Sequence, residues 1–94
     1  MGATTFVTAY GNPATMTVQE AFDEARAQAR HEYGHNGYTG TIAEKDTLYH
    51  VADPDAIDTI LDDDKHPVGR KYGPCGWFVD TELRSFIFFG WASE

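Results

Sequence analysis

The spacing of hydrophobic and polar residues changes along this chain, and each type of spacing predicts a different element. The β-branched and aromatic run Thr4–Tyr10 comes first. It stops at the glycine, asparagine and proline of positions 11–13, which are residues that favour turns. The pattern therefore predicts a first strand that ends in a turn.

A helical spacing follows this turn. Apolar residues recur at intervals of three and four, as expected for one buried helix face: Val18, Ala21, Phe22, Ala25, Ala29 and Tyr33. Thr17 and Glu20 have the spacing of a capping box, which predicts that the helix begins there. Gly34 favours a left-handed end, so the helix should stop near Tyr33 or His35.

Two short runs after the helix predict a hairpin. Tyr38–Glu44 and Thr47–Val51 are rich in strand-forming residues, and Lys45 and Asp46 lie between them as a tight turn.

A second, short helix should follow this hairpin. Asp53 is a suitable N-cap, and Pro54 suits the first helical position. The buried edge of the helix would consist of Ile57, Ile60 and Leu61.

The end of the chain predicts another hairpin. A loop over 65–74 precedes the runs Gly76–Val79 and Ser85–Ala92, which flank a turn at 80–84. The predicted order is thus β-α-β-β-α-β-β in a single α+β domain, residues 1–94. We expect a mainly antiparallel five-stranded sheet with two helices on one face.

The last predicted strand is apolar on both faces. Phe86 and Phe88 alternate with Ile87 and Phe89, whereas a sheet with helices on one side should leave its other face polar. Burial of a central strand would explain this pattern. The second face could also be covered by the loop at 65–74, by a second copy of the protein, or by a target.

The charge of the chain restricts its partners. Fifteen acidic residues against seven Lys and Arg give a net charge of -8, which argues against direct binding of nucleic acid or of anionic membranes. No apolar run is long enough to span a membrane. The single Cys75 excludes an internal disulfide, and the start of the chain lacks the features of a signal peptide. These features predict a cytoplasmic protein.

One motif suggests a metal enzyme. His31, Glu32 and His35 form H-E-x-x-H, in which the two histidines would bind zinc and the glutamate would act as the catalytic base. However, both histidines fall on the polar side of the predicted helix, and no third ligand lies at a diagnostic spacing. A helix break at Gly34 would also separate the two histidines. We therefore predict no cofactor, and keep a zinc hydrolase as an alternative.

An acidic run surrounds the second predicted helix. It consists of Asp53, Asp55, Asp58, Asp62, Asp63 and Asp64. Three aspartates at a helix C-terminus oppose the helix dipole, which suggests a functional reason for their presence. They could imitate the phosphates of a nucleic acid and so contact a basic groove. Alternatively, Lys65, Arg70 and Lys71 neutralise them, and the run only keeps the protein soluble.

The segments Y-G-H-N-G-Y-T-G-T-I (33–42) and F-F-G-W-A (88–92) resemble small uncharacterised accessory proteins of bacteriophages. This resemblance implies a phage origin, where short acidic proteins often block host enzymes or defence systems. It transfers no catalytic residue.

The sequence therefore predicts a non-enzymatic acidic binding protein, an inhibitor of a host protein in the bacterial cytoplasm. Its expected contacts are the second helix and the last strand: Asp58, Asp62, Asp63, Asp64, Phe86, Phe88 and Trp91. A homodimer is compatible with this prediction. A second alternative, beside the zinc hydrolase, is an oligomeric sponge that binds a nucleotide signal between protomers.

Overall fold

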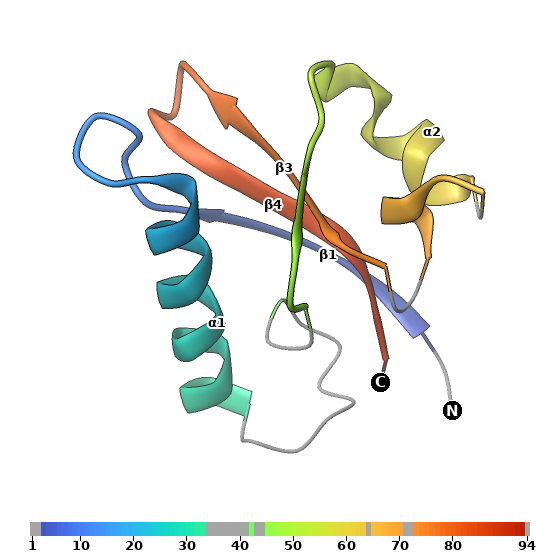
Figure 1. Ribbon diagram of the computed structural model, residues 1–94, viewed down its shortest axis with the longest axis horizontal. Helices are drawn as coiled ribbons and strands as arrows, with labels where there is room; N and C mark the ends of the chain where they lie inside the picture. The colour runs from blue at the N-terminus through green and yellow to red at the C-terminus, as the bar shows by residue number, and fades with distance from the viewer. Residues whose placement is uncertain (1–2, 34–41, 43–44, 64, 71–72, 94) are drawn as a thin grey trace.

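Four strands form one mixed sheet in the described part of the chain. The computed structural model describes residues 3–33, 42, 45–63, 65–70 and 73–93. The strands lie in the order β1-β4-β3-β2 (Figure 1) and comprise β1 (Ala3–Tyr10), β2 (Leu48–His50), β3 (Cys75–Asp80) and β4 (Ser85–Ser93). β4 pairs antiparallel with β1 and with β3, whereas β2 pairs parallel with β3. β1, β2 and β3 therefore run in one direction, and β4 runs in the other.

The two α-helices cover opposite faces of this sheet. α1 (Val18–Tyr33) packs its apolar side, which includes Phe22, on the face that carries Phe86 and Phe88. α2 (Ile57–Asp62) packs on the other face, against Ile87 and Phe89. The 3₁₀ turns η2 (Pro54–Ala56) and η3 (Pro67–Gly69) flank α2. Within the described residues, neither helix is long and apolar enough to cross a membrane.

This arrangement confirms the α+β class and corrects its details. In the described residues the sheet has four strands in place of the expected five, and it is mixed: two of its three strand pairings are antiparallel, and the pairing of β2 with β3 is parallel. The prediction of two helices on one face was wrong, because α1 and α2 bury separate clusters. The strand predicted at Tyr38–Glu44 lies outside the described residues except for Ile42, which is buried in the core beneath α1.

The order of the strands explains why the helices are on opposite faces. The chain crosses from β1 through α1 to β2 at the far edge, and returns through α2 to β3. Both connections join parallel strands, and such crossovers are almost always right-handed. Two crossovers of the same hand that run in opposite directions across a sheet place their helices on opposite faces.

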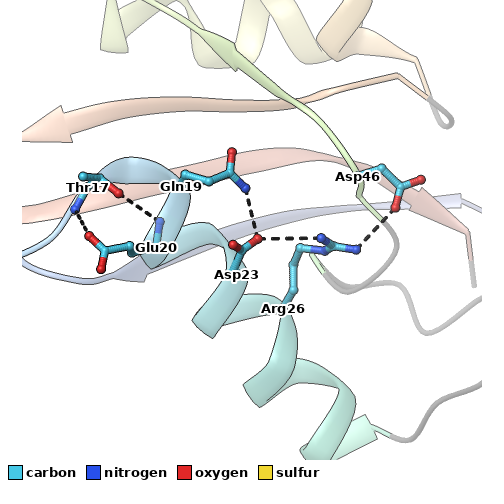
Figure 2. A network of polar contacts seen from close by, with 6 residues as sticks. All are labelled: Thr17, Gln19, Glu20, Asp23, Arg26 and Asp46. Carbon is cyan, nitrogen blue, oxygen red and sulfur yellow. Dashed lines mark hydrogen bonds and ion pairs between the residues drawn. The ribbon is translucent and has the colours of Figure 1, made fainter.

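The start of α1 has the capping box that the sequence predicts. The Glu20 backbone N–H donates to Thr17 Oγ1 at 3.2 Å, and the Thr17 backbone N–H donates to Glu20 Oε1 at 2.9 Å (Figure 2). These bonds satisfy N–H groups that a helix start leaves without partners. Hydrogen bonds from the backbone and hydroxyl of Thr17 also hold the pKa of Glu20 below its usual range.

A polar network connects α1 to the segment that leads into β2. Arg26 lies 3.3 Å from Asp46 Oδ1 and 4.0 Å from Asp23 Oδ1, and Gln19 Nε2 donates to the same Asp23 oxygen at 3.0 Å (Figure 2). The Arg26 guanidinium also lies over the ring of Phe22, 5.2 Å from its centroid. The network therefore holds the approach to β2 against the helix.

We predict that Thr17→Ala destabilises the protein by about 1 kcal/mol, because it removes the side-chain half of the cap. Urea unfolding would measure this loss. Thr59→Ala, at an exposed position inside α2, is the control and should leave stability unchanged or raise it by up to about 0.7 kcal/mol, because Ala is the better helix former. Equal effects of the two substitutions would contradict the capping role.

The pH dependence of Thr17→Ala provides a second test. Because the folded-state pKa of Glu20 is lowered, the ionised Glu20 side chain stabilises the folded protein. This stabilisation is fully present above the unfolded-state pKa and is lost as pH falls through the folded-state pKa. We expect this loss to be smaller in Thr17→Ala than in the wild type, when unfolding is measured across the acidic range.

Candidate functional site

The outward side of the helical segment formed by η2 and α2 carries a row of aspartates. Asp55, Asp58 and Asp62 are spaced by three and four residues, so at about 100° per residue they share one side of the helical segment. The opposite side carries Ile57, Ile60 and Leu61, which pack on the sheet. All three aspartates are exposed, and so is Asp63, which follows the helix. We call the four residues Asp55, Asp58, Asp62 and Asp63 the acidic face.

The local sequence explains the start and the end of this segment. Asp53 Oδ1 accepts a hydrogen bond from the Asp55 backbone N–H at 3.0 Å, and Pro54 occupies the first turn, as predicted. At the other end, the Asp63 backbone N–H donates to the Ile60 carbonyl oxygen at 3.1 Å. The last turn of α2 contains no basic residue, so the partial negative charge of the helix end is not offset from within the helix.

Most of the acidic face has no cationic partner in the described residues. The ion pairs found there join Arg26 to Asp23 and to Asp46, and none involves an aspartate of the acidic face. Lys65 contacts Asp63 through its backbone N–H, which donates to Asp63 Oδ1 at 3.0 Å. Among the described residues, the Lys65 side chain makes no ion pair with the acidic face. Asp64 and Lys71 lie outside the described residues.

Contacts with β4 hold α2 in place. Trp91 Nε1 donates to the Leu61 carbonyl oxygen at 2.6 Å, which gives one of the last carbonyls of α2 a partner. Val68 of η3 is fully buried beside Ile60 in the same cluster. The second face of β4, which seemed to need a cover, is thus covered from within the chain, by α2 and η3.

The aromatic residues predicted as contacts have other positions. Phe86 and Phe88 are buried beneath α1, where their rings pack against each other and Phe88 packs against Phe22. Trp91 is half-buried and holds α2. Of the seven predicted contact residues, the structure places Asp58, Asp62 and Asp63 together on the surface.

The H-E-x-x-H motif lies at the end of the described part of α1. His31 is exposed, as expected from its place on the polar side of the helix, and the helix includes positions 32 and 33. His35 lies outside the described residues. Among the described residues, no three His, Cys, Asp or Glu residues are grouped so that they could hold a metal ion.

One buried charged residue was missed by the sequence analysis. Lys45, predicted to lie in a tight turn, is only 2% exposed, and its Nζ donates to the Gly73 carbonyl oxygen at 3.0 Å. Its side chain runs close to Gly90 and Phe6 in the core. The prediction of a tight turn at Lys45 and Asp46 was wrong, because the Lys45 side chain lies in the core and not in solvent. A lysine beside an aspartate gives no sequence signal of burial.

Cys75 lies in the same core and is fully buried. Burial raises the pKa of its thiol to about 12, although the charge of Lys45 acts in the opposite direction. A thiol with this pKa forms almost no thiolate near neutral pH and is a poor nucleophile. Cys75 is therefore a structural residue of the core.

Comparisons of the chain with models of protein families, with curated proteins and with solved structures found no match.

We predict that Trp91→Phe loosens α2, because the Leu61 carbonyl loses its hydrogen bond at a cost of about 0.5 to 1.5 kcal/mol. Hydrogen exchange should show faster exchange of the α2 amides. Trp77→Phe is the matched control, since Trp77 packs on the α1 side of the sheet and should leave α2 exchange unchanged. Equal acceleration in both variants would contradict this role.

We also predict that Cys75 does not react with a thiol reagent in the native protein at pH 8, and that one equivalent reacts once urea unfolds the chain. The reason is the burial and the raised pKa of the thiol. Stopped labelling followed by mass spectrometry would measure both rates. Rapid stoichiometric labelling without urea would contradict the buried position.

Proposed function

We propose that this protein is a non-enzymatic binding protein that uses its acidic face to contact a basic surface of a host protein. The observation that carries this proposal is the row of exposed aspartates on α2, which points away from the core and makes no ion pair in the described residues. Such carboxylates remain available to Lys and Arg of a partner, where complementary charge speeds association and selects the partner.

The charge of the whole chain supports the same proposal. With a net charge of -8, the protein is repelled by nucleic acids and attracted to proteins that bind them. The acidic face would occupy such a surface in place of phosphates. Together with the resemblance to phage accessory proteins, this supports an inhibitor of a host enzyme or defence system, acting in the bacterial cytoplasm.

Capture from a bacterial lysate would identify the partner. The immobilised protein should retain a protein with a basic surface, and DNA or RNA added in excess should release it if the acidic face imitates phosphates. Release by salt alone, without competition by nucleic acid, would support surface occupation without mimicry.

We predict that Asp58→Asn/Asp62→Asn weakens binding of the captured partner by about 2- to 30-fold, since each exposed ion pair contributes roughly 0.2 to 1 kcal/mol. The matched control is Glu24→Gln/Glu82→Gln, which removes two exposed negative charges elsewhere and so changes the net charge equally. Titration calorimetry at two salt concentrations would compare the variants.

The salt dependence should become weaker only in the aspartate variant, because it loses local charge pairs. Equal affinities of wild type and aspartate variant would reject the acidic face as the contact. Equal losses in both variants would also reject it, since net charge alone would then determine binding.

A further inference from the structure

One edge of the sheet is long and unpaired in the described residues. β1 pairs with β4 along all eight of its residues, from Ala3 opposite Ser93 to Tyr10 opposite Phe86. It is the first strand in the sheet order, so no other described strand pairs with its outer side (Figure 1). An edge of this kind presents a row of backbone N–H and C=O groups that can pair with another strand.

This edge lacks the features that usually prevent such pairing. Natural edge strands are protected by charged residues, prolines, bulges or short length. β1 contains no charged residue and no proline, and residues 3–19 carry no charge at all. Its pairing with β4 is continuous and has no bulge. The other edge strand, β2, has only three residues, and Asp53 and Asp55 follow it closely.

The outer face of β1 is also uncovered. Thr5, Val7 and Ala9 are exposed, and the Val7 side chain reaches 63% exposure. The β4 partners of Val7 and Ala9 are Phe89 and Ile87, which lie beneath α2, so the cover supplied by α2 ends at β4. An exposed apolar strip therefore lies beside the free edge.

We propose that β1 pairs with β1 of a second copy of this chain, antiparallel and about a two-fold axis through Val7. The two four-stranded sheets then form one continuous eight-stranded sheet. In this register Val7 lies opposite its own copy, Thr5 lies opposite Ala9, and Phe6 lies opposite Thr8. Every pair joins residues of the same sheet face, and Val7, which is 63% exposed, packs against Val7 of the second copy.

Charge determines where a second copy can pair with this chain. Two chains that each carry -8 repel each other wherever acidic residues meet, and β1 is an edge strand with no acidic residue in it or in the segment up to residue 19. The β-branched and aromatic cross-strand pairs stabilise the contact without any charge. A basic partner would instead contact the acidic face, where its Lys and Arg side chains meet exposed carboxylates.

The first test is the mass of the protein in solution. Sedimentation equilibrium of the full chain at about 100 μM should give twice the monomer mass. Val7→Lys should shift the protein to the monomer, because two lysines would then meet at the axis. The control Leu83→Lys adds the same charge at a 65% exposed position on the β3–β4 turn and should remain dimeric. A monomeric wild type, or a dimeric Val7→Lys variant that circular dichroism shows to be folded, would overturn the proposal.

The second test is the register. Directly opposed residues in antiparallel strands have Cα atoms about 4.5 to 5.5 Å apart, which suits a disulfide. Val7→Cys should therefore form a covalent dimer under mild oxidation. In Thr5→Cys the two new thiols would lie about 14 Å apart, since four residues along a strand span about 13.6 Å. Cys75 is buried and does not compete.

Faster cross-linking of Val7→Cys than of Thr5→Cys would support the proposed axis. Equal rates would indicate random collision, and would overturn it. A faster rate for Thr5→Cys would also overturn it. Because these tests need no captured partner, their failure leaves the proposed function of the acidic face untouched.

Discussion

Because β4 lies between β1 and β3 and carries apolar side chains on both of its faces, each face must be removed from water by a separate layer. Phe86 and Phe88 are covered by α1, whereas Ile87 and Phe89 are covered by α2 and η3. Removal of either layer would expose part of a strand that has no polar face. Burial of large apolar side chains contributes roughly 1.5 to 3 kcal/mol each, so both layers are needed for stability.

This division into two layers also determines what reaches the surface. α2 is short, and its inner side is fully used by contacts with the sheet, so its aspartates can only point outward. The bond from Trp91 to the Leu61 carbonyl holds the acidic end of the helix at a defined place. On the same side of the sheet, β1 extends beyond the cover of α2 and remains uncharged. The two proposed contact surfaces thus differ in chemistry, one acidic and one apolar with open backbone groups.

Local signals in the sequence predicted local features well. The capping box at Thr17, the N-cap at Asp53 and the last two strands occur where the residues indicate them, because each depends on neighbours a few positions away. The charge pattern placed the aspartates of α2 on the surface for the same reason. The alternation in β4 indicated two buried faces, but it did not tell whether a helix, a loop or a second chain covers the second face.

The sequence by itself determined where the described helices and most strands begin and end, and which of their sides are apolar. Only the tertiary structure decided that β2 pairs parallel with β3, that α1 and α2 lie on opposite faces, and that Lys45 is buried. The physical reason is the range of the interactions. Helix caps and the apolar side of a helix depend on residues within one or two helical turns of each other. Strand pairing and the burial of a side chain instead depend on segments that are distant in sequence. Leu48 and Cys75, which lie opposite each other in the sheet, are an example that no local pattern indicates.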